Sequence, residues 1–203
     1  MRRLIARTAL VLLVTAVVAV AGPEALPGFE PMQTGPGAPG RWDSVADDGG
    51  TAGRAVEQSS DDPTDGRFPL LIRMATAPAN VTVRVRIKPM AGSVDRAGGI
   101  ALRLLDRDNY YVVRANALEG NVRFYKVVAG RRMQLTGADV PVASGVWHDL
   151  AVTAQDDRFT VSFDGRELFA ATDATIGTPG KIAFWTKADS VTRFDRLDVE
   201  ELR

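Results

Sequence analysis

The amino-acid sequence predicts an all-β protein in which two antiparallel sheets pack face to face. Three observations support this prediction. Apolar and polar residues alternate strictly over positions 81–88, which is typical of a half-buried strand. No segment shows the periodicity of an amphipathic helix. Many short strand candidates are separated by Gly, Pro, Asn and Asp, a pattern typical of β-sandwiches and barrels.

The other strands are predicted from the same alternation and from the turns that bound them. Asp164-Gly165 is a strong two-residue hairpin signal, and Ala129-Gly130 fits a similar turn. Besides positions 81–88, the predicted strands are Arg41–Val45, Ala55–Gln58, Leu70–Met74, Gly99–Leu105, Tyr110–Asn116, Asn121–Val128, Arg131–Gly137, Trp147–Ala154, Arg158–Phe163, Glu167–Ala171, Lys181–Thr186 and Thr192–Glu200.

Residues 1–21 have the composition of a secretory signal peptide. Arg2, Arg3 and Arg7 form a positive region before the apolar run Ala9–Val20, and Ala19-Val20-Ala21 is a small-residue cleavage pattern. The run is short for a membrane span. We therefore expect a bacterial protein that is secreted or periplasmic, with no membrane span after cleavage. The alternative is an uncleaved N-terminal anchor.

The remaining chain divides into a tail and one domain. Residues 22–40 are rich in Pro and Gly and show no periodicity, which predicts a flexible linker. The regular strand pattern then predicts a single sandwich domain over residues 41–203, which is long enough to bury a sizeable core.

Composition excludes several classes of function. Lys and Arg together number 25, as do Asp and Glu, and this balance argues against a nucleic-acid partner. The chain has no cysteine and one histidine. Disulfides, thiolate catalysis and zinc sites built on cysteine or several histidines are therefore excluded.

Residues 99–136 predict an antiparallel meander with one apolar and one polar face. Loops at Asp106–Asn109 and Ala117–Gly120 and the turn at Ala129-Gly130 agree on this division. The apolar face collects Leu102, Leu104, Tyr111, Val113, Val122, Phe124, Met133 and Leu135, with Lys126 as a charged exception. The polar face collects Arg103, Tyr110, Arg114, Asn116, Asn121, Arg123, Tyr125, Arg132, Gln134 and Thr136.

This register predicts two pairings on the polar face. Arg103 lies opposite Val112, and Arg114 lies opposite Arg123. Like charges directly across a strand pair are destabilising, so a carboxylate or a ligand should compensate, unless the arginines simply extend into water. Arg and Asn offer directional hydrogen bonds to sugar hydroxyls, and Tyr offers a stacking surface. We therefore hypothesise that this face binds a sugar.

Five segments of the chain carry a family resemblance: Ala97–Ile100, Asp108–Asn116, Trp147–Leu150, Phe163–Gly165 and Gly180–Leu197. They resemble the concanavalin A-like lectin/glucanase superfamily, and in particular its laminin-G-type branch and the 3-keto-disaccharide hydrolase domain family. The resemblance spans roughly positions 42–202. It implies a two-sheet jelly roll with a ligand face on its concave sheet, for which the polar face of the meander is a natural candidate.

We therefore predict an exported carbohydrate-binding module. The predicted ligand-binding residues lie on the polar face of the meander and near the end of the strand at 181–186, where Trp185 and Lys187 are spaced as an aromatic platform beside a cation. They are Arg103, Arg114, Asn116, Arg123, Tyr125, Trp185 and Lys187.

Two other functions stay open. The resemblance implies a hydrolase or lyase acting on keto-disaccharides or other glycosides, with His148, Lys187, Tyr111 or a carboxylate as candidate base. The paired-carboxylate E-x-D-x-x-E pattern of retaining glucanases is absent from the sequence. The third interpretation is an envelope module that binds another protein.

Asp195 is the one candidate metal ligand. It resembles the late-strand acid that ligates a structural calcium ion in related sandwich modules, and Asp43 or Asp47 would complete such a site. Calcium prefers six to eight oxygen ligands. No other cofactor is predicted.

Overall fold

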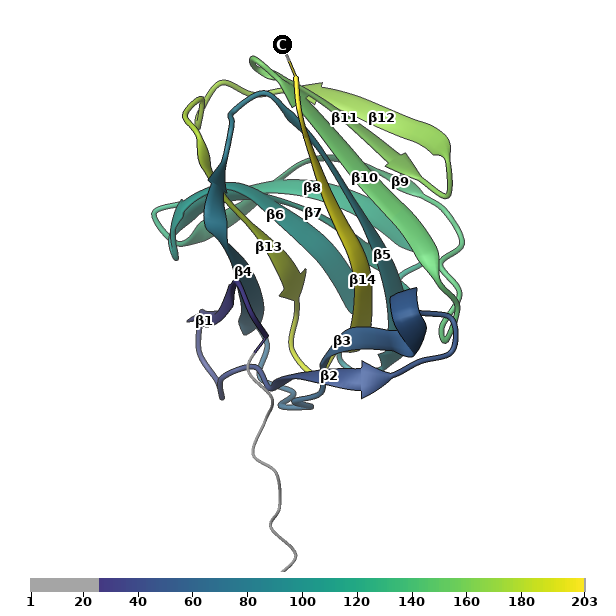
Figure 1. Ribbon diagram of the computed structural model, residues 1–203. Coiled ribbons are helices and arrows are strands. Elements are labelled where there is room, and N and C mark those ends of the chain that lie inside the picture. Colours follow the sequence, from purple (N-terminus) through teal and green to yellow (C-terminus); the bar gives the residue numbers. More distant parts are fainter. Residues whose placement is uncertain (1–25, 203) are drawn as a thin grey trace, which may run out of the picture.

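The computed structural model describes residues 26–202. Two seven-stranded antiparallel sheets pack face to face (Figure 1), so the predicted two-sheet jelly-roll class is confirmed. The only helical element among the described residues is the 3₁₀ turn η1 (Thr51–Gly53). No helix in that part of the chain is long and apolar enough to cross a membrane. The predicted signal peptide at 1–21 lies outside the described residues.

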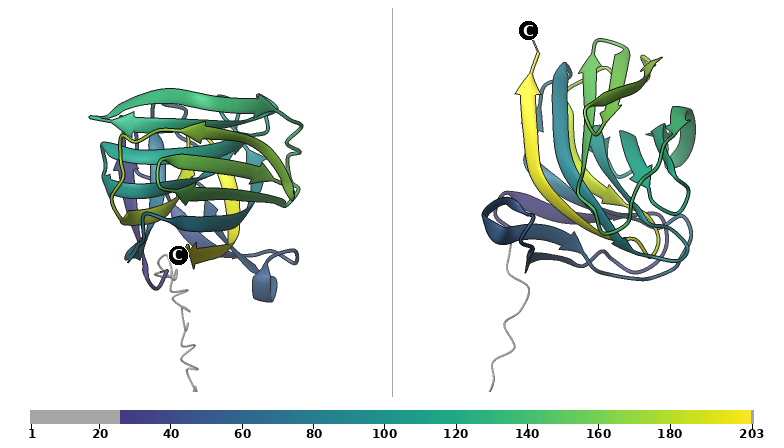
Figure 2. Two further views of the ribbon diagram at one scale, coloured as in Figure 1. Left: turned by 90° about the horizontal axis from the view of Figure 1, so that it is seen from above. Right: turned by 90° about the vertical axis from the view of Figure 1, so that its right-hand side faces the viewer.

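We refer to the two layers as sheet A and sheet B. Sheet A has the strand order β1-β4-β13-β6-β7-β8-β9, and sheet B has the order β12-β11-β10-β5-β14-β3-β2. Strands distant in sequence are thus neighbours, and β5 and β14 run side by side through sheet B (Figure 2). The strands of sheet A are β1 (Phe29–Thr34), β4 (Phe68–Ala77), β6 (Ala97–Asp106), β7 (Asn109–Asn116), β8 (Asn121–Val128), β9 (Arg131–Asp139) and β13 (Gly180–Thr186). Those of sheet B are β2 (Trp42–Ala46), β3 (Arg54–Gln58), β5 (Val81–Ala91), β10 (His148–Gln155), β11 (Arg158–Phe163), β12 (Arg166–Thr172) and β14 (Val191–Glu201).

The hydrophobic core fills the space between the two sheets. Tyr111 and Phe124 of sheet A meet Phe159 of sheet B, with ring centres 4.6 and 5.0 Å apart. Tilted aromatic pairs of this kind add about 0.5–1.5 kcal/mol each beyond the burial of their area. Most of the predicted apolar face lies in this core, because Leu102, Tyr111, Val113, Val122 and Phe124 are all completely buried.

Three residues of the predicted apolar face behave differently from the others. Leu104 packs in a second apolar cluster outside the core, and Met133 is 38% exposed. Lys126, the charged exception, forms an ion pair of 2.6 Å with Asp173. The hydroxyl of Tyr111 donates to the same carboxylate at 2.7 Å, so a buried anion explains the lysine at the edge of the core.

The predicted pairing of Arg103 with Val112 is wrong, because β6 is irregular. Val112 pairs with Ala101, and the register shifts between Leu102 and Asp106. Arg103 has a φ of 46°, a left-handed conformation that is costly for a residue other than glycine. Beyond this irregularity, the side chains of β6 face the opposite side of the sheet from the one that strict alternation predicts.

Part of the predicted linker at 22–40 is an ordered strand. β1 pairs with β4, with Met32 opposite Leu70, and the ring of Phe29 stacks on Phe184 at 5.6 Å. The domain therefore begins before residue 41. Pro31 obscured the strand in the sequence, and it is tolerated because β1 is an edge strand of sheet A.

Candidate functional site

The outer face of sheet A, which is directed away from sheet B, is concave. Arg132 on β9 and Phe68 on β4 both project from this face, and four strands lie between theirs. In a flat sheet that separation would be about 24 Å, yet the guanidinium carbon of Arg132 lies 4.9 Å from the centre of the Phe68 ring. Hydroxyls of Tyr110 on β7 and Thr34 on β1 are likewise 3.4 Å apart. Sheet A therefore curls around its outer face.

The floor of this concave face is the second apolar cluster, to which Trp185, Tyr125 and Phe68 contribute. Trp185 is completely buried and stacks on Phe68 with ring centres 5.3 Å apart. Tyr125 is 8% exposed. The guanidinium carbon of Arg132 lies 4.7 Å from the ring centre of Tyr125 and 6.0 Å from that of Trp185. The rings therefore form a supporting layer beneath charged groups rather than an open stacking platform.

Arg114 is the centre of the first charged group on this face. It lies opposite Arg123, as predicted, and is 4% exposed. Its guanidinium donates to the side-chain oxygen of Asn121, to Glu119 at 2.7 Å and to the hydroxyl of Tyr125 at 3.1 Å. Asn121 also donates to Glu119 at 3.1 Å. These bonds hold a carboxylate that is 46% exposed above a buried arginine.

Lys187 is the centre of the second charged group. It follows β13 and pairs with Asp95 at 2.8 Å and with Asp65 at 3.1 Å. The amide of Asn116 donates to the other oxygen of Asp95 at 2.7 Å. Burial raises the pKa of the Asp95 carboxyl. Burial lowers the pKa of Lys187, but pairing with its two acids outweighs this and raises it overall, so the lysine is held in its charged form.

The two charged groups are close enough to act on each other. The charges of Arg114 and Glu119 both contribute to the electrostatic environment of Asp95, and the charge of Lys187 contributes to that of Glu119. Burial raises the pKa of Glu119, but the nearby cations and hydrogen bonds lower it overall. At neutral pH the face therefore presents an ionised acceptor, Glu119, and an ionised donor, Lys187.

Asp189 fixes the loop that carries Asp95. Its carboxylate accepts hydrogen bonds from the backbone N–H groups of Ser93, Val94 and Asp95 at 2.6–3.1 Å. It also accepts one from the hydroxyl of Ser93 at 2.9 Å. A carboxylate bound by several N–H groups is a strong, charge-assisted anchor. Asp189 is therefore a positioning residue for the second charged group.

Gly99 makes room for two large side chains on the concave face. Trp185, Gly99 and Arg114 are neighbours across β13, β6 and β7. A Cβ atom at Gly99 would overlap the carbonyl oxygen of Val113 and lie 2.9 Å from the Cβ of Arg114. The missing side chain thus makes room for the large tryptophan and arginine on the two strands that flank β6.

Most of the predicted ligand-binding residues come together on this concave face. Arg114, Asn116, Arg123, Tyr125, Trp185 and Lys187 all project there or lie at its rim. Arg103 does not: it is 2% exposed, and its guanidinium donates to the main-chain carbonyls of Ala79, Asp156 and Ile176 at 2.7–3.1 Å. Its N–H groups therefore bind main-chain carbonyls of neighbouring loops rather than a ligand.

Sequence patterns missed the acids of the face. Asp95 and Asp65 lie in loops, where aspartate ordinarily serves turns, and Glu119 lies in the turn between β7 and β8. The only available signal was the unexplained pair of arginines at 114 and 123, which required a nearby carboxylate. No pattern identified which acid would supply it.

Asp195, the predicted calcium ligand, is held by cationic and neutral donors. Its carboxylate accepts hydrogen bonds from Arg86 at 3.0 Å and from the backbone and hydroxyl of Thr51 at 3.1 and 3.0 Å. Asp47 is bound by Lys88 and Arg193 in a similar way. Residues 26–202 contain no group of three or more His, Asp or Glu placed to share a metal ion.

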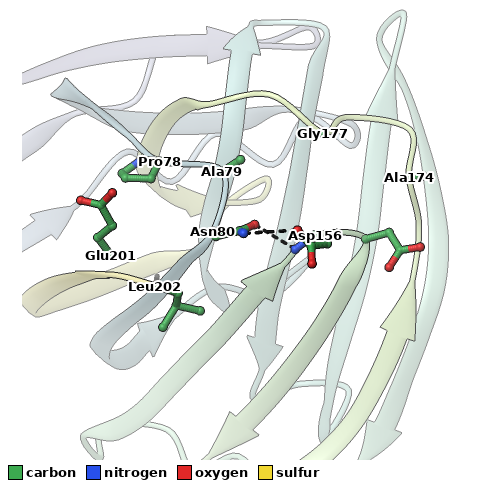
Figure 3. Close-up of a pocket in the computed structure, with 9 residues that line it drawn as sticks. Pro78, Ala79, Asn80, Asp156, Ala174, Gly177, Glu201 and Leu202 are labelled. Carbon is green, nitrogen blue, oxygen red and sulfur yellow. Dashed lines mark hydrogen bonds between the residues drawn. The ribbon is translucent and has the colours of Figure 1, made fainter.

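A pocket of about 510 Å³ lies among the loops that Arg103 holds, with Ala79 and Asp156 in its lining (Figure 3). Asn80 and Asp156 line it and are bonded to each other, with the Asp156 backbone donating at 2.8 Å and the Asn80 amide donating at 3.3 Å. Glu201 lies at another part of the lining. Asn80 and Asp156 thus satisfy each other, whereas the charged groups of the concave face end in the exposed carboxylates of Glu119 and Asp65.

No protein-family model matches this chain, and no curated protein matches it in sequence. Solved structures do share its fold. The carbohydrate-binding module CBM66 from Bacillus subtilis is 20% identical, with a TM-score of 0.69 over 86% of this chain and 96% of the module. A β-glucanase from Bacillus licheniformis is 14% identical, with a TM-score of 0.59 over 89% of this chain and 95% of the enzyme.

A third similar structure is the carbohydrate esterase of the Shiga toxin-encoding bacteriophage phi24B. It is 18% identical, with a TM-score of 0.55 over 87% of this chain and 91% of that protein. At these identities the likenesses establish the concanavalin A-like jelly-roll fold. The fold is thus one shared with carbohydrate-binding modules and glycosidases, and membership of the laminin-G-type or 3-keto-disaccharide hydrolase branch stays a prediction.

Proposed function

We propose that this protein is a carbohydrate-binding module whose ligand lies on the concave outer face of sheet A. The supporting observation is the pair of adjoining charged groups built on Arg114 and Lys187. Both consist of ion pairs whose buried members form further hydrogen bonds while one acid of each group reaches solvent. Sugar hydroxyls are recognised by such directional, preorganised donors and acceptors.

The members of the groups have different roles in this proposal. Glu119 and Asp65 have side chains 46% and 80% exposed, so they can accept hydrogen bonds from hydroxyls. Lys187, at 16%, can donate to a sugar oxygen. Arg114 and Asp95 are nearly buried and hold these three in place.

Calorimetric titration against a glycan panel, with Glu119→Gln as the test variant, checks the proposal. Loss of the charge-assisted acceptor should weaken binding about tenfold or more, since hydrogen bonds to charged groups contribute about 1.5–3 kcal/mol. Glu167→Gln, an exposed change on β12 of sheet B, is the matched control and should bind as the unmodified protein does. Equal binding by both variants, or no binding of any glycan, would contradict the proposal.

Turnover should be scored on the same panel with oxidised disaccharides included, since a hydrolase or lyase acting on keto-disaccharides is the alternative function. His148, one candidate base, is in sheet B rather than on the concave face. Its ring stacks on Phe163 at 4.9 Å, and its Nδ1 lies 2.8 Å from Asp164. No observation on the concave face favours turnover over binding.

Export is part of the proposal and has its own test. The predicted signal peptide at 1–21 would deliver the module outside the cytoplasm, where glycans are available. N-terminal sequencing of the protein from the culture medium or periplasm should find Gly22 as the first residue, whereas an intact Met1 in the membrane fraction would indicate an anchor instead.

A further inference from the structure

Arg132 is a cation of the concave face that has no acidic partner within ion-pair distance among the described residues. Arg114 pairs with Glu119, Lys187 with Asp95 and Asp65, and Arg123 with Asp139. Within residues 26–202, Arg132 forms neither a hydrogen bond nor an ion pair, and its guanidinium lies against aromatic rings. An arginine held in place but unpaired is available to an anion from outside.

The three rings hold the guanidinium without using its donors. Its carbon lies 4.9 Å from the ring centre of Phe68, 4.7 Å from that of Tyr125 and 6.0 Å from that of Trp185. Ring faces attract a cation, but they are weak hydrogen-bond acceptors. The side chain is therefore fixed by packing on the floor of the face while its N–H groups remain unsatisfied by protein acceptors.

The surroundings of Arg132 favour a singly charged, planar anion. A guanidinium binds a carboxylate through two parallel hydrogen bonds. Asp65 is near enough for Arg132 to contribute to its electrostatic environment, and Glu119 and Asp95 lie on the same face. These acids would repel a group with two negative charges more strongly than a carboxylate.

We propose, building on the proposed function, that the preferred ligand is an acidic sugar whose carboxylate pairs with Arg132. The ligand class is that of uronic-acid oligosaccharides. The carboxylate binds the arginine above the ring layer, and hydroxyls of the same or the next sugar reach the exposed acids Glu119 and Asp65. Arg132 thus favours ligands that carry a carboxylate, and the two charged groups bind the sugar hydroxyls.

Calorimetric titration with matched pairs of ligands tests this inference. Oligomers of galacturonic, glucuronic and mannuronic acid are each compared with their methyl esters, which keep the sugar and remove the charge. We expect at least one acid to bind about tenfold or more tightly than its ester at low ionic strength, with the difference shrinking as salt is added.

Three variants assign the preference to Arg132. Arg132→Gln should lower the affinity for the acid about tenfold, to that of the ester, and leave the ester unchanged. Arg132→Lys keeps the charge and loses the planar fork, so it should retain part of the preference. Arg131→Gln, the exposed neighbour on the same strand, is the control and should behave as the unmodified protein, with melting temperatures measured for all.

The outcomes separate this inference from the proposed function. Equal binding of acid and ester, equal losses for both ligands in Arg132→Gln, or binding of neutral glycans alone would overturn the inference and leave carbohydrate binding standing. Should Arg132→Gln fail to fold, a reduced acid preference in Arg132→Lys would still support the inference, and an unaltered preference there would overturn it. Binding of no glycan by the unmodified protein would overturn both.

Discussion

Arg114 and Arg123 lie directly opposite each other on β7 and β8, and each is neutralised by a different carboxylate. Arg114 pairs with Glu119 at 2.7 Å, and Arg123 pairs with Asp139 at 2.6 Å. The two ion pairs differ in burial, because the side chain of Arg114 is 5% exposed and that of Asp139 is 84% exposed. The repulsion that the sequence implied is thus relieved by two acids in different environments.

This difference predicts unequal costs for removing the two arginines. Arg114→Ala should lower the free energy of unfolding by about 2–4 kcal/mol, because it leaves polar partners on a buried face unsatisfied. Arg123→Ala should cost less than about 1 kcal/mol, as exposed ion pairs do. Urea unfolding of both variants measures the two costs, and equal costs would contradict the assignment of Arg114 as a buried anchor.

Asp189 should make stability depend on pH in the acid range. Burial raises the pKa of this carboxyl, but hydrogen bonds from Ser93, Asp95 and Val94 lower it from 3.8 to about 2. A group whose pKa is lowered by folding contributes stability above its unfolded value, and that contribution is lost as pH falls through the folded value. The contribution is on the order of 2 kcal/mol, lost between about pH 4 and pH 2.

Asp189→Asn should therefore make unfolding less dependent on pH over that window, by the contribution of this one carboxyl, while other acids with lowered pKa values, such as Asp62, keep theirs. It should also weaken glycan binding, although Asp189 is not proposed to touch the sugar, because Asp189 holds the loop that carries Asp95. A variant that keeps the original acid dependence would show that another carboxyl is responsible.

Tyr111 should affect stability in the alkaline range. Burial and the hydrogen bond to Asp173 raise the pKa of its hydroxyl from 10.0 to about 12. A raised pKa in the folded state gives stability that is present below about pH 10 and is lost as pH rises toward 12. Absorbance titration of phenolate follows this directly, and Tyr111→Phe should remove one late-titrating tyrosine from the three in the chain.

Gly99→Ala should disturb the concave face from beneath. The added methyl group would overlap the carbonyl of Val113 and crowd Arg114, which should cost about 1–3 kcal/mol, as overpacking does, and weaken glycan binding. Gly177→Ala is the control, because a Cβ atom there meets nothing within 4 Å. Thermal or urea unfolding that treats the two variants alike would contradict the account of Gly99.

Local pattern was sufficient for much of the meander. Alternation and turn residues predicted β8 and β11 with the bounds that the structure has, and the opposition of Arg114 and Arg123 followed from the turn between them. The prediction failed where a strand departs from simple alternation. The irregular backbone at Arg103 turned a predicted surface residue into a buried one, and Pro31 concealed an edge strand.

The sequence by itself determined the all-β class, most of the strands and the concentration of arginine on one face of the meander, because these depend on a period of two residues and on local turn chemistry. Only the tertiary structure decided which acids neutralise those arginines, since Asp65 and Asp95 are brought to Lys187 from separate loops. The curl of sheet A likewise placed Arg132 on Phe68, across four strands. Curvature and long-range contacts arise from the packing of the whole sheet, and no local pattern encodes them.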